Sequence, residues 1–568
     1  MKKHIICISL VFVLFFFFPS VVRAEFQQNF DFYSFLKSGG EYLMDYKLEQ
    51  MSLAEKVGQL FQIGFTGFEP DAAIEDMIKN HYVGGVIYFS RNIKNPEQTA
   101  RLSNQLQELA LSSGTGLPLF ISTDQEGGVV TRIKGVTHFP SNMALGAADD
   151  KKLTNKIGKA VGSELKNLGI NFNLAPVLDV NNNPDNPVIG VRSFGGDPKL
   201  VAKLGKAYIN GIQSEGIIAT AKHFPGHGDT DTDSHLELPI IKHGKQRLNE
   251  VELYPFKKAV KTGVESIMTA HVYFPAFEKK DGIPATLSES VLTDLLRKKM
   301  NFKGLIITDC MEMKAIADNF GTAEGAVRTI EAGSDIVLVS HTYTEQKKAV
   351  KAVIEAVRSG RISEKRIDKS VKRIIKSKAK NLNPANLTKA SAENIDFEAH
   401  QKIAAKTAKK AVTEVKNQDI LPIKNIENKK ITVVDFKMKK ESLAEDSEQS
   451  KNYFVESLKE DLNNIKHLSF SRAPRLEKYK EDLRESDLVI VCTSNAASNR
   501  EQALLAEKLA EDYKVLVLAM RNPYDFKYLN NIQAFITTYD YSPANQRAAA
   551  DFILGKIDAK GKLPVKID

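Results

Sequence analysis

The chain has 568 residues, of which 42% are hydrophobic and 26% charged, with 34 Gly and 20 Pro. This composition excludes disordered, collagen-like and coiled-coil proteins, and the length allows roughly three or four average domains, or fewer if one is a large barrel. The formal charge is +9, but no arginine-rich stripe interleaved with aromatic residues is present. Nucleic acid is therefore not an expected partner.

The first 24 residues have the pattern of a secretory signal peptide. Two lysines precede an apolar run from Ile5 to Phe18, and Val22 and Ala24 are small residues at the −3 and −1 positions of a cleavage site. The run is short for a membrane span, which needs about 20 apolar residues, so we expect cleavage. Cleavage removes three basic residues and lowers the formal charge from +9 to +6. We expect an exported protein, secreted or associated with the cell wall, without a membrane span in its mature form.

Eight short apolar runs alternate with helical patterns between residues 58 and 341, in a domain that we assign to residues 25–380. Alternating strands and helices indicate a parallel sheet, because each return to the sheet requires a crossover. Eight such units over about 280 residues predict a (β/α)₈ TIM-type barrel, with an open doubly wound sheet as the alternative. The expected strands are residues 59–65, 83–89, 117–123, 171–179, 217–222, 266–271, 304–308 and 335–339.

Ionisable residues recur where these strands end. They are Asp124 with Glu126, Asp179, Lys222 with His223, His271 and Asp309. A single such residue is often a helix cap. The βα loops of a barrel gather on one face, however, so recurrence at the same topological position favours an active site at that face.

A second, smaller α/β domain is expected at residues 399–568, after a linker at residues 381–398. The patterns predict helices at residues 400–415 and 501–511, and strands at residues 431–436, 487–492, 514–519 and 532–538. This domain could bind wall polymer or pack on the barrel. The sequence has no Trp and no aromatic ladder, which favours packing.

The segment from Lys222 to His235 is the richest in chemistry, since four of the chain's 11 histidines lie between His223 and His243. A metal site is one interpretation and a surface loop of satisfied histidines is another. His223 and His227 cannot share a helical face as a zinc pair does, because Pro225 and Gly226 separate them. No recognisable ligand set accompanies them, so we expect neither a metal nor another cofactor.

Acid–base chemistry is the favoured interpretation of this segment. Asp233 and His235 are two residues apart, and an aspartate bonded to one imidazole nitrogen leaves the other free to exchange a proton near neutral pH. Asp309 ends an apolar strand that would hold its carboxylate rigidly. A fixed carboxylate opposite a proton donor suits glycosidic cleavage. By spacing alone, Asp309 could equally be a metal ligand or a base.

Several short motifs follow one another along the chain. They are Asp124–Gly128, Asn173–Val180, Arg192–Gly195, Lys222–Asp229, Asp233–His235, Met268–His271 and Pro284–Ser288, with looser ones at Tyr541–Ala544 and Gly561–Val565. These motifs resemble glycoside hydrolase family 3, and more narrowly its β-N-acetylglucosaminidase branch and the exported two-domain enzymes of Gram-positive bacteria. The resemblance covers most of residues 50–380 in order, and the long block from Lys222 to His235 is the most specific.

The resemblance implies an exo-acting, retaining enzyme that removes terminal GlcNAc from peptidoglycan-derived fragments, either muropeptides or amino-sugar oligosaccharides. Asp309 would be the nucleophile, His235 the general acid and then base, and Asp233 its partner. The residues expected to bind the terminal sugar's hydroxyls are Asp124, Arg192, Lys222 and His223. The resemblance implies no cofactor, and we expect a monomer.

Three other functions stay open at this point. Phosphate could replace water as the acceptor, because a neutral base repels anions less than a carboxylate does. A family 3 β-glucosidase would take its acid from the second domain, with Glu501 as the candidate. A wall-binding protein without activity is disfavoured, because the charged residues at the strand ends are present.

Two residues beside the expected nucleophile depart from the family pattern. Cys310 is expected to be a small buried side chain and not a reactive thiol. Glu312 is a rival carboxylate three residues from Asp309.

Overall fold

The structure of the chain is a computed structural model that describes residues 41–382, 386–437, 440–446 and 451–567. The expected signal peptide, residues 1–24, lies outside the described residues. Two compact units are separated at residue 50. In the first, the described part is helix α4 (Glu41–Gln50). The second unit holds two domains. Within the described ranges, no helix is long and apolar enough to cross a membrane.

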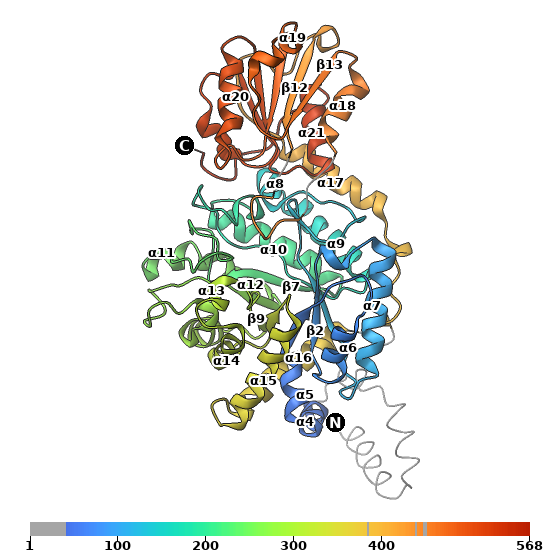
Figure 1. Ribbon diagram of the computed structural model, residues 1–568, viewed down its shortest axis with the longest axis vertical. Coiled ribbons are helices and arrows are strands. Elements are labelled where there is room, and N and C mark those ends of the chain that lie inside the picture. The colour runs from blue at the N-terminus through green and yellow to red at the C-terminus, as the bar shows by residue number, and fades with distance from the viewer. Residues whose placement is uncertain (1–40, 383–385, 438–439, 447–450, 568) are drawn as a thin grey trace, which may run out of the picture. The chain divides into compact units, whose positions relative to one another are not determined.

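The first domain is a nearly closed barrel of eight parallel strands (Figure 1). Their order is β10-β1-β2-β3-β6-β7-β8-β9, and a parallel bridge between Ile307 and Ile336 joins the two ends. The barrel prediction is confirmed over the open doubly wound sheet. The strands are β1 (Phe61–Gly64), β2 (Gly85–Tyr88), β3 (Phe120–Thr123), β6 (Phe172–Asn173), β7 (Ile218–Phe224), β8 (Ser266–Thr269), β9 (Leu305–Ile307) and β10 (Val337–Val339).

Helices follow these strands and bury their apolar faces on the barrel. In the helix over Pro96–Leu111, Asn95 caps the first turn by accepting a bond from the Gln98 amide, and Pro96 occupies the first helical position. The barrel helices are α5 (Leu53–Gln59), α6 (Ala72–Lys79), α7 (Pro96–Leu111), α8 (Asn142–Ala148), α9 (Lys151–Asn167), α10 (Pro198–Ser214), α11 (Lys245–Glu250), α12 (Leu253–Thr262), the π-helix η4 (Ser290–Lys299), α13 (Lys314–Ala317), α14 (Thr322–Ala332), α15 (Tyr343–Arg358) and α16 (Glu364–Asn381).

One expected barrel strand is much shorter than predicted. The sequence predicts a strand over residues 171–179, but β6 contains only two residues. Pro176 has no amide hydrogen and cannot continue the ladder. Single backbone bonds still hold this segment beside β7, such as Thr220 N to Ala175 O at 2.9 Å and Leu178 N to Lys222 O at 2.6 Å.

The second domain contains a six-stranded sheet in the order β11-β16-β15-β14-β12-β13, in which only the β11–β16 pair is antiparallel. Its strands are β11 (Thr413–Asn417), β12 (Ile431–Phe436), β13 (Ile465–Phe470), β14 (Leu488–Thr493), β15 (Val515–Ala519) and β16 (Ala534–Thr537). Two of these strands, β11 and β13, were not predicted. The helix predicted over residues 400–415 ends at Ala411, and β11 begins at Thr413, within the range predicted as helix. In β13, Lys466, His467 and Ser469 interrupt the apolar pattern.

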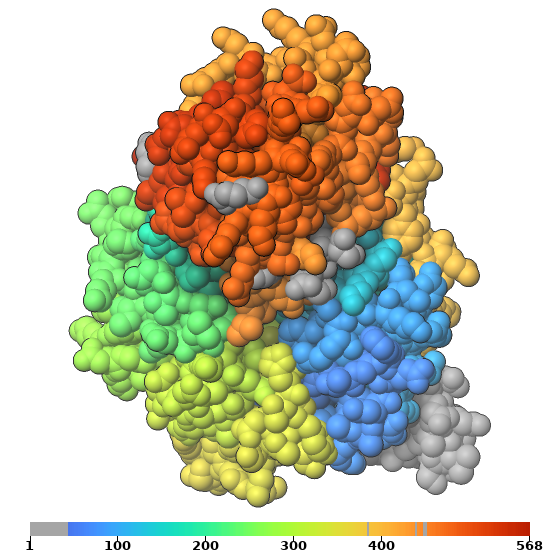
Figure 2. Space-filling view, turned by 45° about the horizontal axis from the view of Figure 1, so that its top comes forward, coloured from blue at the N-terminus to red at the C-terminus, as the bar shows by residue number. Residues whose placement is uncertain are grey.

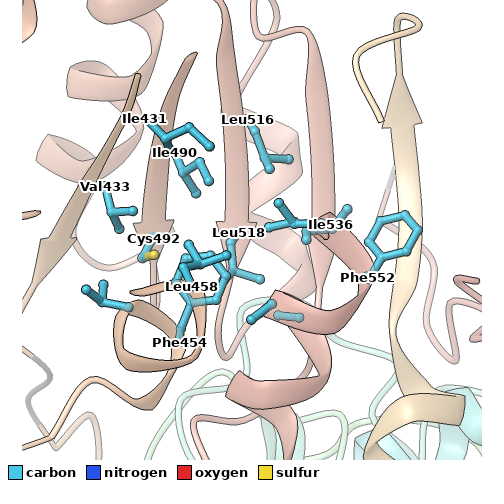
Figure 3. Close-up of a cluster of buried hydrophobic side chains, with 14 of the residues drawn as sticks. Ile431, Val433, Phe454, Leu458, Ile490, Cys492, Leu516, Leu518, Ile536 and Phe552 are labelled. Carbon is cyan, nitrogen blue, oxygen red and sulfur yellow. The ribbon is translucent and has the colours of Figure 1, made fainter. Parts of the chain in front are cut away.

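Helices cover both faces of this second sheet (Figure 1). One face carries α17 (Phe397–Ala411), α18 (Tyr453–Asp461) and α21 (Pro543–Ile553), and the other carries α20 (Arg500–Ala510). Alternate residues of a strand point to the same face, so Ile431 and Val433 join Ile490 and Leu516 in one buried cluster with Phe454 of α18 (Figure 3).

The second domain packs on loops that follow β3 and β6, which lie at the carboxyl end of the barrel. The Ser141 amide donates to Asp540 Oδ2 at 2.6 Å, and the Gly196 amide donates to Pro564 O at 2.9 Å. Figure 2 shows the orange and red second domain against the barrel. A shared apolar cluster includes Val129, Met143, Val191, Tyr539, Tyr541 and Val565.

Candidate active site

Asp309 lies two residues beyond the end of β9, and one of its carboxylate oxygens has no partner among the described residues. The Cys310 amide donates to Oδ1 at 2.7 Å, whereas no described residue donates to Oδ2. Burial alone would raise the pKa of this carboxyl, but the imidazoles of His223, His271 and His235 outweigh burial and lower the pKa. Asp309 is therefore ionised at neutral pH, and its charge faces three histidines.

Asp233 and His235 form a hydrogen-bonded pair in the loop after β7. Asp233 Oδ1 lies 2.7 Å from His235 Nδ1 and also accepts a bond from the His235 amide at 2.8 Å. Burial would raise the pKa of Asp233, but the hydrogen bond from His235 lowers it. Because the carboxylate is ionised, Nδ1 carries a proton. Among the described residues, His235 Nε2 has no partner, and His235 is close enough to Asp309 to lower that residue's pKa.

His227 holds the loop that carries this pair. Its Nε2 lies 3.0 Å from Ser234 Oγ, and its Nδ1 lies 2.9 Å from Thr230 Oγ1. Burial lowers the pKa of His227 to about 4, so the ring is neutral. Its role is structural. Within the described ranges, no group of three or more His, Cys, Asp or Glu side chains is arranged to hold a metal ion.

Glu126 brings three of the expected sugar-binding residues together. Its two oxygens accept bonds from Arg192 Nε and Nη2, both at 2.9 Å, and Lys222 Nζ lies 2.6 Å from Oε1. The same Lys222 ammonium lies 2.7 Å from Asp124 Oδ1. Burial would raise the pKa of Glu126, but the charges of Arg192 and Lys222 lower it. With 14% of its side chain exposed, against 1–5% for the other three, Asp124 is the most accessible of this set.

A register shift between β7 and β8 accounts for two consecutive residues of β7 reaching this region. Neighbouring strand residues normally point to opposite faces, yet Lys222 and His223 both contact groups at the carboxyl end. The register between β7 and β8 shifts between Ala221 and Phe224, and such irregularities re-aim side chains.

Asp179 orients His223, the fourth expected sugar-binding residue. His223 Nδ1 lies 2.7 Å from Asp179 Oδ2, while Oδ1 accepts the amides of His223 and His227 at 3.1 and 2.7 Å. Burial would raise the pKa of Asp179, but the neighbouring His223 lowers it. No described residue bonds His223 Nε2, so this nitrogen is available to a ligand.

Three residues raised as alternatives or departures have other partners. The carboxylate of Glu312 accepts the amides of His341 and Thr342 at 2.6 and 2.9 Å, so it ties two loops together. Burial raises the pKa of Cys310 to about 12, which keeps the thiol protonated. Glu501 lies on α20, where it accepts a bond from the Ala473 amide at 3.4 Å within the second domain.

Three contributors to this region were given no site role by sequence reasoning. Glu126 was noted with Asp124 at the end of its strand, but it was not assigned to the sugar site. Arg132 lies further along the same loop, with Nη2 3.9 Å from Asp124 Oδ2. Asp446 comes from the second domain and lies 2.9 Å from Arg132 Nη1. Nothing in the local sequence around residue 446 points to this contact.

Comparison with known proteins identifies related chains over nearly the whole length. Residues 52–377 match the glycosyl hydrolase family 3 N-terminal domain, and residues 415–568 match the family's C-terminal domain. Beta-hexosaminidase A from Pseudoalteromonas piscicida is 31% identical, over 87% of this chain and 91% of the relative. A beta-N-acetylglucosaminidase/beta-glucosidase from Cellulomonas fimi is 26% identical, over 91% of this chain and 94% of the relative.

A solved structure extends this similarity to three dimensions. The glycoside hydrolase family 3 beta-N-acetylglucosaminidase from Paenibacillus sp. str. FPU-7 superposes with a TM-score of 0.87. It is 41% identical and covers 91% of this chain and 99% of its own. Both domains of the present chain are matched. The chain belongs to glycosyl hydrolase family 3 and is a glycoside hydrolase.

Proposed function

We propose that the enzyme is an exo-acting, retaining β-N-acetylglucosaminidase that removes non-reducing terminal GlcNAc from peptidoglycan-derived fragments. The observation that carries this proposal is that Asp309 Oδ2 and His235 Nε2, neither of which has a hydrogen-bond partner among the described residues, lie at the same end of the barrel. One is a nucleophile held ionised and the other a proton carrier oriented by Asp233. The names of the related hexosaminidases support GlcNAc as the sugar.

In the first step of the proposed reaction, Asp309 Oδ2 attacks the anomeric carbon. The bond from that carbon to the glycosidic oxygen breaks, and the oxygen takes the proton of His235 Nε2–H. The electron pair of the broken bond stays on the departing oxygen, and the sugar is left as an ester of Asp309. Asp233 stabilises the imidazolium that donates the proton, because its carboxylate accepts Nδ1–H at 2.7 Å.

In the second step, the neutral His235 acts as a base. Nε2 takes a proton from water, the water oxygen bonds to the anomeric carbon, and the ester bond to Asp309 breaks with its electron pair returning to the carboxylate. Two displacements at one carbon retain the configuration. The low pKa of Asp309 makes its carboxylate a good leaving group.

The remaining expected residues would bind and orient the sugar. Asp124, with its partly exposed carboxylate, and His223, with its free Nε2, are the groups proposed to contact the hydroxyls. Arg192 and Lys222 would hold Glu126 and Asp124 in position, since their nitrogens are committed to those carboxylates. From the pattern of residues 1–24, we also propose that the enzyme acts outside the cell, free or at the wall.

The function is tested by product analysis. Purified enzyme is incubated with 4-nitrophenyl β-GlcNAc, 4-nitrophenyl β-glucoside and a muropeptide, with and without phosphate. The proposal predicts preference for GlcNAc, release of free β-GlcNAc first, and the same product in phosphate. GlcNAc-1-phosphate would show a phosphorylase, and preference for glucose would contradict the proposal. Glu501→Gln is the matched control, because it alters the rival acid of a β-glucosidase and is expected to leave turnover unchanged.

A further inference from the structure

A chain of six charged side chains with alternating sign runs from the barrel into the second domain. In order, its members are Arg192, Glu126, Lys222, Asp124, Arg132 and Asp446. Five successive contacts link them, four at 2.6–2.9 Å and one, between Asp124 and Arg132, at 3.9 Å. Three positive and three negative charges cancel only when Asp446 is counted. The barrel residues alone carry three positive and two negative charges.

Asp446 is docked on the barrel through both its backbone and its side chain. Its amide donates to Val129 O at 3.1 Å, and its Oδ2 accepts the Thr131 amide at 2.8 Å. Its Oδ1 lies 2.9 Å from Arg132 Nη1 and also accepts the Ser90 hydroxyl. The residue is therefore fixed by loops that follow two barrel strands, β2 and β3.

Arg132 depends on Asp446 for its charge partner. Only 9% of the Arg132 side chain is exposed, and a buried guanidinium needs a nearby carboxylate. Burial would lower the pKa of Arg132, but Asp446 first and Asp124 second raise it. At 2.9 Å, Asp446 makes the hydrogen-bonded contact, whereas Asp124 at 3.9 Å lies beyond hydrogen-bond distance.

The 3.9 Å gap preserves an open oxygen on Asp124. Lys222 bonds Oδ1, and no described residue donates to Oδ2. If Arg132 lost its outer partner, Coulomb attraction would draw it toward Asp124, and a normal ion pair at about 2.8 Å would occupy Oδ2.

We propose that Asp446, supplied by the second domain, is a positioning residue for sugar binding: it holds Arg132 back from Asp124 and so keeps Asp124 Oδ2 free to accept a substrate hydroxyl. This rests on the proposed role of Asp124 in binding the terminal sugar. It assigns the second domain a function in the binding step, and it predicts an effect on KM with little effect on kcat, because Asp446 lies outside the pair that exchanges the proton.

The test is a set of full-length variants assayed on the best substrate of the wild type. Asp446→Asn keeps the shape and loses the charge, and we expect KM to rise about tenfold with kcat within about twofold. Asp446→Glu restores the charge and should recover most of the affinity. Glu485→Gln removes one negative charge from an exposed site in the same domain, 73% exposed, and should match the wild type.

The decisive variant is the double change Asp446→Asn with Arg132→Gln. If Asp446 acts by restraining Arg132, removing the arginine frees Asp124 again, and KM should return to within about threefold of the wild type. If Asp446 had only a structural role, the losses of affinity from the two changes should add, and KM of the double variant should not recover. A wild-type KM in folded Asp446→Asn, or a double variant as weak as Asp446→Asn or weaker, would overturn the inference. If Asp446→Asn alone does not fold, the KM values of Asp446→Glu and of the charge-balanced double variant decide whether the inference stands.

Failure of the proposed function would be recognised separately. A wild type that prefers glucose contradicts that function, and the same variants are then compared on glucose, because the contacts among Asp124, Arg132 and Asp446 do not depend on which sugar is bound.

Discussion

Both ends of the barrel bury ionised groups, but among the described residues the two ends differ in how completely their carboxylates are hydrogen-bonded. At the amino end, Asp335 is fully buried before β10. Its Oδ1 accepts from Ser370 Oγ at 2.7 Å and Arg373 Nη1 at 3.0 Å, while its Oδ2 accepts the Ile306 amide at 3.0 Å and a bond from Arg297. At the carboxyl end, Asp309 Oδ2 has no donor among the described residues.

The comparison shows that burial and charge alone do not mark a catalytic group. Asp335 is fully buried and Asp309 is partly exposed, yet neighbouring arginines or histidines outweigh burial and lower the pKa of each. The difference is that both oxygens of Asp335 are bonded: Oδ1 accepts from α16, and Oδ2 accepts from β9 and η4. A buried carboxylate with all its bonds made is structural, and one with a free oxygen beside a proton carrier is a candidate for chemistry.

Replacement of Asp309 by Ala should have the largest effect on the carboxyl end. Without its nucleophile, the enzyme should lose at least about 10⁴-fold in kcat while its melting temperature changes little. Glu312→Ala is the control, since this carboxylate bonds only the amides of His341 and Thr342, and it should keep turnover within about tenfold of the wild type. Steady-state kinetics measure both. The reverse order of losses would reassign the nucleophile.

Replacement of Asp335 by Asn should have the converse effect. Three partly buried arginines surround this aspartate, and losing its charge leaves them without balance, which we expect to cost about 3–5 kcal/mol in the free energy of unfolding. Turnover per folded molecule should stay unchanged. Urea unfolding together with active-site titration separates the two quantities. Asp294→Asn, at an exposed position of the same helix as Arg297, is the control and should change stability by less than about 0.5 kcal/mol.

Replacement of Asp233 by Asn tests whether the free nitrogen of His235 needs its partner. An amide at this position no longer stabilises the imidazolium, so kcat should fall about 10²- to 10³-fold with a smaller change in KM. Steady-state kinetics of the variant measure both constants. An unchanged kcat would mean that Asp233 only shapes the loop.

The sequence predicted most of the barrel because its strands are short, apolar and separated by amphipathic helices. Where the prediction was wrong, a local chemical reason exists. Pro176 ends the ladder of β6. The edge strand β13 has a mixed polar and apolar sequence, and none of its side chains is fully buried, so its pattern does not predict a strand. The end of α17 was extended too far because a helical pattern carries no sharp stop before the β-branched residues Val412 and Thr413.

The candidate site was predictable only where its residues share a short motif. Asp233 and His235 lie two residues apart, and Asp309 ends its strand, so their chemistry can be inferred locally. Arg132 and Asp446 are 314 positions apart and meet only after both domains have folded. A charged loop residue such as Asp446 otherwise has the properties of an ordinary solvated side chain, so its role is invisible without the three-dimensional contact.

Lys378 offers the smallest and most specific test of the amino end. Its ammonium group is fully buried, donates to Gln59 Oε1 at 2.8 Å and lies 5.1 Å from the centre of the Phe120 ring. Burial lowers the pKa of Lys378 from 10.5 to about 7. Between these values the unfolded chain binds a proton that the folded chain does not, so this group makes stability rise with pH, by up to about 1.4 kcal/mol per unit.

Lys378→Met should therefore flatten the dependence of stability on pH. From pH 7 to 9, the free energy of unfolding of the wild type should rise by about 2 kcal/mol relative to the variant, because methionine has no proton to lose. Lys376→Met, at an exposed position on the same helix, should keep the wild-type slope. Urea unfolding at each pH measures the difference. Parallel slopes for Lys378→Met and the wild type would mean that Lys378 stays charged in the folded protein. Its ammonium group would then be stabilised by its described neighbours Gln59 and Phe120.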